Sequence, residues 1–217
     1  MKRKNLAIAL LFNVLIIIFE IVGFILSTER HGFNAIKYYT QLSNFLTLIV
    51  NVIFCVCAII SFVKKNNIKK WVVILRYIST LNLTITLIIV LTILIPAIPN
   101  SFSQMMLKNS NLYYHFICPI LSIVSFMFFE RGVEFDKSKI YLSLVPTVVY
   151  GVVCLILNAL KVITGPYPFF YVYEFKWYIL TFYLLSIITG IYIIAVIIFY
   201  LFNKKWEKSS KNNKKVV

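Results

Sequence analysis

The segment LAIALLFNVLIIIFEIVGFILS, residues 6–27, carries a single ionisable side chain, Glu20, and decides the class of fold. A helix of about 20 apolar residues crosses the ~30 Å hydrocarbon core of a bilayer. Lys2, Arg3 and Lys4 precede the segment as in a secretory signal, but the apolar region of such a signal has only about 7–15 residues. We therefore interpret residues 6–27 as a retained first membrane-spanning helix.

Five further apolar segments of similar length follow, at residues 38–63, 71–95, 112–129, 140–160 and 177–202. The chain is 61% hydrophobic and 13% charged, whereas soluble domains have roughly 45–50% apolar and about 25% charged residues. None of the segments alternates as a barrel strand does. We predict an all-α, polytopic membrane helix bundle with six transmembrane helices, one domain over residues 1–203, and a disordered basic tail over residues 204–217.

The positions of the basic residues predict the orientation of the bundle. Of the 22 Lys and Arg residues, 16 lie in the N-terminus, the 64–70 loop, the 130–139 loop and the tail, and five lie in the alternate loops. Because Lys and Arg concentrate on the cytoplasmic side, both termini are predicted to be cytoplasmic. The last of the 22 basic residues, Arg76, lies inside the third segment, and its side chain is predicted to snorkel to the cytoplasmic surface.

The same charge pattern predicts the partners. A net charge of +15 in a soluble protein would suggest nucleic acid, but the basic clusters here are short loops between apolar segments. We expect them to contact anionic lipid headgroups, and we expect no nucleic-acid partner. The high Lys, Ile and Asn content indicates a bacterium with an AT-rich genome, and hence the plasma membrane.

Motifs of common enzymes and metal sites are absent from the sequence. The four cysteines lie inside apolar segments without CxxC or Cys/His spacing, so we predict no metal, no disulfide and no cofactor. The sequence has no GxSxG, HExxH or P-loop pattern. These absences leave soluble hydrolase, protease and ATPase mechanisms unsupported.

Polar residues recur at helical spacing within two segments: Thr40, Asn44, Thr47 and Asn51 in the second, and His115, Cys118, Ser122 and Ser125 in the fourth. Such stripes either hydrogen-bond helix to helix or line a polar site. Both segments enter the membrane from the outer side, so at 1.5 Å per residue Thr40 and His115 share one depth. Glu20 lies less than two turns farther in and is the acidic candidate for the same pocket, together with Gln41.

The outer loop between Lys161 and Lys176 is rich in aromatic residues. Aromatic rings at a membrane surface either form an interfacial belt or, in the alternative, cover a polar site with apolar surface. In the second case Tyr167, Phe169 and Phe170 form a lid over the bound substrate.

Three short segments, KYYTQLSN at 37–44, YYHFICP at 113–119 and TGPYPFF at 164–170, carry a family resemblance. The chain resembles the androgen-induced-gene and androgen-dependent TFPI-regulating family and its small bacterial six-helix relatives. The resemblance implies a membrane threonine hydrolase of fatty-acid esters of hydroxy fatty acids. It would make Thr40 the nucleophile and His115 its base.

The chemistry of these residues is consistent with that assignment. A threonine hydroxyl needs a base to take its proton, and a neutral imidazole serves at physiological pH. A third group orients the histidine in such sites, and Asn44 or Glu20 is the candidate; His31 is a weaker second base. Our leading hypothesis is a lipid-ester hydrolase, and the alternative is a transporter or binding protein for lipids or small molecules.

Overall fold

A computed structural model describes the backbone of residues 3–214 and the side chains of residues 3–32 and 34–204; within this part of the chain there is no strand. The α-helices are α1 Arg3–His31, α2 Tyr39–Val63, α3 Lys70–Ile89, α4 Ile95–Ala97, α5 Cys118–Phe128, α6 Ser138–Ala159 and α7 Trp177–Lys214. Short 3₁₀ turns lie at η1 Gly32–Lys37 and η5 Pro168–Phe170, and π-helical turns at η2 Val90–Leu94, η3 Ser103–Leu107 and η4 Leu112–Ile117. Each predicted apolar segment is helical.

Five helices of the described chain are long and apolar enough to cross a membrane: Arg3–His31, Tyr39–Val63, Lys70–Ala97, Ser138–Ala159 and Trp177–Lys204. The chain is therefore a helical membrane protein. The fourth predicted segment forms a shorter apolar helix, Leu112–Phe128, which combines η4 and α5. The helix α7 extends to Lys214 and so includes most of the 204–217 segment that was predicted to be disordered, because no Pro or Gly interrupts it there.

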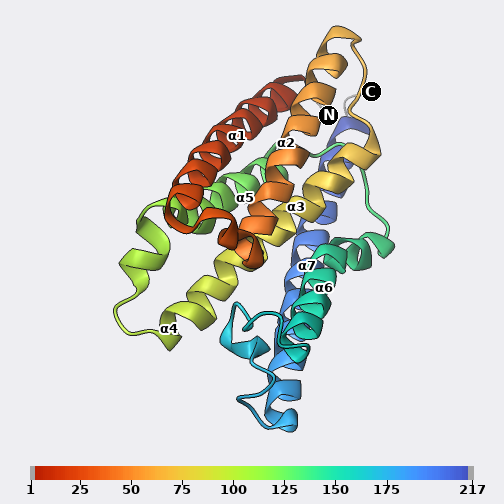
Figure 1. Ribbon diagram of the computed structural model, residues 1–217. Coiled ribbons are helices and arrows are strands. Elements are labelled where there is room, and N and C mark those ends of the chain that lie inside the picture. The colour runs from red at the N-terminus through yellow and green to blue at the C-terminus, as the bar shows by residue number, and fades with distance from the viewer. Residues whose placement is uncertain (1–2, 215–217) are drawn as a thin grey trace.

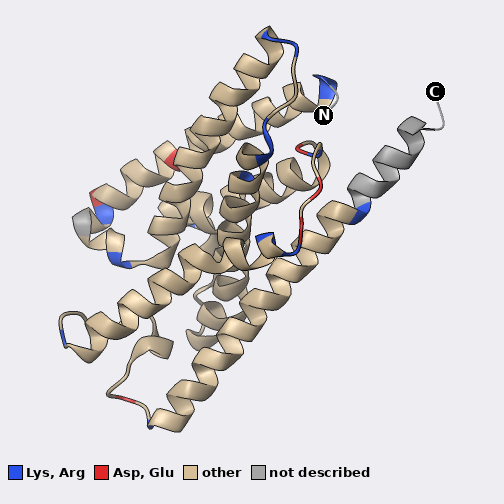
Figure 2. Cartoon of the chain, turned by 90° about the vertical axis from the view of Figure 1, so that its right-hand side faces the viewer, with Lys and Arg blue, Asp and Glu red and all other residues tan. Residues whose placement is uncertain are grey.

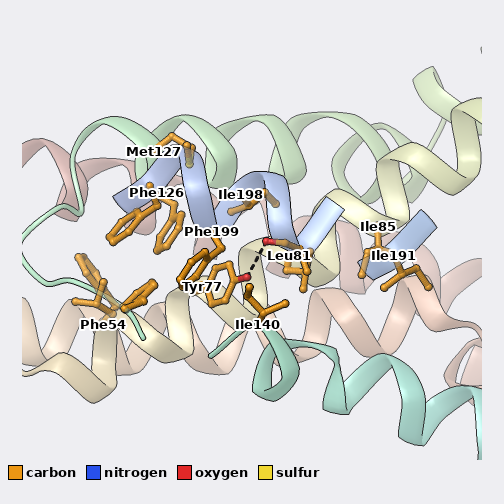
Figure 3. Close-up of a cluster of buried hydrophobic side chains, with 14 of the residues drawn as sticks. Phe54, Tyr77, Leu81, Ile85, Phe126, Met127, Ile140, Ile191, Ile198 and Phe199 are labelled. Atoms are coloured by element: carbon orange, nitrogen blue, oxygen red, sulfur yellow. Dashed lines mark hydrogen bonds between the residues drawn. The ribbon is translucent and has the colours of Figure 1, made fainter. Parts of the chain in front are cut away.

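The helix α3 lies at the centre of the bundle (Figure 1), with α2 and α5 against one side and α6 and α7 against the other. The helix α1 completes the first group by packing on α2 and α5. Figure 3 shows the buried cluster between α3 and α7, in which the Tyr77 hydroxyl donates to the carbonyl of Ala195 at 2.9 Å. Hydroxyl groups buried in hydrocarbon need such partners, so this bond fixes α7 against α3.

The loop between α5 and α6 folds into the end of the bundle that carries the α2–α3 loop. Phe135 stacks on Phe202 of α7, with ring centroids 4.7 Å apart. The side-chain amide of Asn203 accepts from the Phe135 N–H at 3.2 Å and donates to the Phe135 carbonyl at 2.9 Å. The loop is thereby attached to α7, and it closes the bundle at this end.

Glu130 of the same loop pairs with Arg76 of α3, and this contact corrects the prediction for Arg76. The two side chains are fully buried, with 2.9 Å between Nη2 and Oε1. Arg76 also donates to Asn51 of α2 at 2.6 Å, and Glu130 also accepts from Asn13 of α1 at 3.1 Å. Arg76 does not snorkel, because the carboxylate that compensates its charge folds inward from the loop.

Polar side chains also join the helices near the start of α2. The Tyr39 hydroxyl donates to Asn82 of α3 at 2.6 Å, and Thr147 of α6 donates to the same amide oxygen at 3.0 Å. Ser43 of α2 and Thr86 of α3 share a 3.0 Å hydrogen bond. These residues act as interhelical hydrogen-bonding groups, which orient the start of α2 toward α3 and α6.

Lys and Arg residues are concentrated toward the end of the bundle that carries the α2–α3 loop and the start of α1 (Figure 2). The opposite end carries fewer of them, as the loop counts in the sequence require.

Candidate functional site

Thr40 and His115 meet at the end of the bundle opposite the α2–α3 loop. Thr40 is the second residue of α2 and is half-buried, whereas His115 lies on η4 and is buried. The His115 Nε2 atom is 3.3 Å from the Thr40 hydroxyl oxygen. The structure thus brings together the two residues that the sequence places at one depth.

A backbone carbonyl fixes the tautomer of His115. Its Nδ1 atom is 2.6 Å from the carbonyl oxygen of Met105. Because a carbonyl only accepts, Nδ1 carries the proton, and in the neutral ring Nε2 is then the acceptor. Nε2 therefore accepts the hydrogen of the Thr40 hydroxyl, which is the arrangement that a general base needs.

The position of His115 depends on a π-helical turn that Pro119 explains. A proline inside a helix lacks the N–H that would bond four residues back, and its ring crowds that carbonyl. Here the carbonyl four residues back is that of His115 itself. The turn widens, and the Cys118 N–H bonds to the carbonyl of Tyr113, five residues earlier. Such π turns re-aim side chains and are frequent at functional sites.

Thr40 is one of the residues that line an apolar cavity of about 160 Å³. Its walls come mainly from α3, α6, α7 and the α6–α7 loop, with residues such as Ile85, Leu144 and Ile191. A second cavity of about 460 Å³ is lined by some of the same residues, Ile89 and Ile191 among them. Two adjoining, largely apolar cavities with a few hydroxyl groups on the wall suit a ligand with a long hydrocarbon part and a polar group.

The three aromatic residues assigned to the lid are buried and line the same cavity as Thr40. Tyr167 stacks on Phe169 with centroids 5.2 Å apart, and Phe170 packs against Phe169 at 4.9 Å. Burial raises the pKa of Tyr167 to about 12, although hydrogen bonds with the Thr40 side chain and with the backbone of Tyr39 and Thr40 oppose the rise. The phenol is therefore neutral and available as a donor at physiological pH.

The polar residues assigned to the supporting pocket lie around the pair in different ways. Asn44 donates to the backbone carbonyl of Thr40 at 2.7 Å. Gln41 accepts from Ser27 at 2.9 Å and donates to the Tyr114 hydroxyl at 3.3 Å, so it faces α1 rather than the cavity. Glu20 is buried beside Cys118.

The orienting group of His115 is thus neither Asn44 nor Glu20, the two candidates from the sequence. It is the carbonyl of Met105, on the turn η3. No sequence signal identifies a backbone acceptor, because every residue carries one. His31, proposed as a weaker base, is exposed and packs near Tyr38, with ring centroids 6.5 Å apart.

Among the side chains that the structure describes, no three His, Cys, Asp or Glu residues are grouped so that they could hold a metal ion. The arrangement can accept a proton from Thr40 and can hold an apolar ligand beside it. No family model matches the sequence, and no curated protein and no solved structure proves similar to the chain.

Proposed function

We propose that this protein is a membrane-embedded hydrolase of lipid esters, with Thr40 as the nucleophile and His115 as the general base. One observation carries the proposal. His115 is held between a carbonyl that fixes its proton on Nδ1 and the hydroxyl of a threonine that lines an apolar cavity. An activated hydroxyl on the wall of an apolar cavity fits an acyl-transfer reaction on a lipid.

The reaction proceeds in two steps. The Thr40 oxygen attacks the ester carbonyl carbon while its proton passes to His115 Nε2, and this proton then goes to the departing alkoxide to release an alcohol. Water next attacks the acyl-threonine, with His115 accepting one proton of the water and returning it to the Thr40 oxygen. The products are a fatty acid and an alcohol, and the enzyme is restored.

The location of the site follows from the proposed topology. In this topology the chain crosses the membrane six times, with the short helix Leu112–Phe128 as the fourth span, and both termini lie in the cytoplasm. A helix of 17 residues is at the lower limit of a membrane span. With this orientation Thr40 and His115 lie near the outer surface of the plasma membrane, where substrate enters from the outer leaflet.

The resemblance to the androgen-induced-gene and androgen-dependent TFPI-regulating family supports the same pair. It rests on the short segments around Thr40, His115 and Tyr167, and both His115 and Tyr167 lie against Thr40. The resemblance suggests esters of fatty acids as the substrate class.

The second candidate function is binding or transport of a lipid or another amphiphilic molecule without hydrolysis. The observation in its favour is the pair of adjoining cavities, whose combined size suits a bound hydrocarbon chain. Under this reading Thr40 and His115 only hydrogen-bond the ligand. The two functions differ in whether the Thr40 oxygen becomes covalently modified.

A long-chain alkyl fluorophosphonate applied to membranes that contain the protein tests the proposal. We expect a covalent adduct on Thr40, identified by mass spectrometry of peptides. Thr40→Ser should retain part of the labelling because the hydroxyl remains. His115→Ala should reduce the labelling rate at least a hundredfold, as expected for loss of a general base.

Thr92→Ala is the matched control. Thr92 lines the neighbouring cavity, but its hydroxyl donates to the carbonyl of Ile88 within the same helix, so its loss should not change labelling. If Thr40→Ala keeps the ester hydrolysis of the wild type, Thr40 is not the nucleophile. Binding of the substrate without an adduct or turnover would favour the second function.

A further inference from the structure

Tyr167 is the polar side chain of the outer loop that lies against Thr40. The residue is 9% exposed, and it lines the same cavity as Thr40. Its oxygen lies close to the Thr40 side chain and to the backbone N–H groups of Tyr39 and Thr40, which lower its pKa. These are the first two residues of α2, whose N–H groups have no acceptor inside the helix, and Tyr38 supplies no side-chain cap.

The remaining hydroxyl groups on the cavity wall have other partners. Tyr39 and Thr147 both donate to Asn82. Tyr150 donates to the carbonyl of Lys37 at 2.8 Å, and Thr86 donates to the carbonyl of Asn82 at 3.2 Å. On this wall the hydroxyl hydrogen of Tyr167 therefore remains as a donor for a ligand, beside the Thr40 side chain.

We infer that the Tyr167 hydroxyl, held in place by the N–H groups of Tyr39 and Thr40, donates to the oxygen of an acyl group whose hydrocarbon chain lies in the apolar cavity. The inference rests on the proposed function where it concerns an ester carbonyl. It also applies without any reaction, to the carboxylate of a free long-chain fatty acid. In hydrolysis the same donor stabilises the negative charge that develops on the carbonyl oxygen as Thr40 attacks.

The packing of Tyr167 makes it suitable for this role. Its ring stacks on Phe169 and meets the ring of Tyr38 edge-on, with centroids 6.2 Å apart. The hydroxyl is thus held in place before a ligand enters. A fixed donor in an apolar surrounding stabilises charge better than a mobile one, because little reorganisation is needed.

The test compares Tyr167→Phe with the wild type in lipid nanodiscs. Two quantities are measured: the Kd of radiolabelled oleate, with empty nanodiscs as the blank, and the kcat and KM for a long-chain fatty-acid ester. Loss of one hydrogen bond to a carboxylate should weaken oleate binding about tenfold or more. Loss of one donor to the reacting oxygen should lower kcat about a hundredfold with little change in KM.

Tyr173→Phe is the matched control from the same loop. The Tyr173 hydroxyl donates to the carbonyl of Ala159, and the residue is exposed and lines neither cavity described above. Its loss should change neither quantity. Phenylalanine keeps the aromatic ring, so the packing with Phe169 is retained in the Tyr167 variant.

The outcomes separate this inference from the hydrolase proposal. If the wild type does not hydrolyse esters but Tyr167→Phe still weakens oleate binding, the acyl-oxygen site stands and the hydrolase proposal fails. If the wild type does not bind oleate, or if Tyr167→Phe changes neither oleate affinity nor kcat, the inference is wrong. A change of the same size in Tyr173→Phe would assign the effect to the loop as a whole and would also overturn it.

Discussion

At the scale of single residues, the Arg76–Glu130 pair connects α3 and the α5–α6 loop with three other helices. Both side chains are fully buried, and they are joined to Asn13 of α1, Asn51 of α2 and Ser122 of α5. The pair stabilises the bundle only while both charges are present, because either one alone would be an uncompensated charge in a medium of low dielectric constant.

Glu130→Gln tests this dependence. The substitution leaves the Arg76 guanidinium buried without its counter-ion, and we expect it to lower the free energy of unfolding by about 3–5 kcal/mol. The measurement is the melting temperature of the purified protein in detergent, followed by size-exclusion chromatography after heating. Glu134→Gln is the control, since Glu134 is an exposed residue of the same loop. Equal melting temperatures for Glu130→Gln and the wild type would contradict the prediction.

The sequence predicted some of these residue-scale contacts and could not predict others. The shared depth of Thr40 and His115 follows from helical rise and orientation, and the two lie in contact. The carbonyl of Met105 and the inward turn of Glu130 depend on the paths of two loops. Loop paths leave no periodic signal in a sequence, so the acceptor of His115 and the partner of Arg76 emerged only from the structure.

At the scale of elements, two π-helical turns each precede a proline. The turn Val90–Leu94 lies just before Pro96, and the turn Leu112–Ile117 lies just before Pro119. In both cases a hydrogen bond to the carbonyl five residues earlier replaces the regular one. The second turn carries His115, so the direction of the imidazole depends on a proline four residues away.

Pro119→Ala tests the function of that turn. Alanine restores the missing N–H and favours a regular α-helix, which would rotate His115 relative to α5. We expect the bundle to remain folded while the labelling rate of Thr40 by the fluorophosphonate falls about a hundredfold, the effect of a misplaced catalytic group. Pro146→Ala, inside α6, is the control. An unchanged labelling rate in Pro119→Ala would show that the π turn does not position the base.

At the scale of the whole molecule, the surrounding bilayer explains why some helices are buried while others expose apolar side chains. The helix α3 is the most buried of the five long helices, whereas α6 and α7 expose rows of large apolar side chains such as Val148, Ile156 and Ile188. The composition predicted this class of protein because it reflects the solvent around the helices. It did not predict α3 as the centre, since the apolar segments differ too little to reveal which helix others surround.

The orientation of the whole bundle is the last prediction. Positive loops at one end imply that Lys64 is cytoplasmic and that Lys108 is outside. Both side chains are exposed, so a cysteine at either position can react. In a background with the four native cysteines replaced by alanine, Lys108→Cys should react with a membrane-impermeant maleimide in intact cells.

Lys64→Cys should react only after the membrane is permeabilised. The comparison is internally controlled, because the two exposed positions lie in loops at opposite ends of the bundle and differ only in the side they face. The reverse pattern would invert the bundle and place Thr40 and His115 at the cytoplasmic surface. Substrate would then come from the inner leaflet, while the contact between the two residues would be unaffected, since it depends on helix packing and not on orientation.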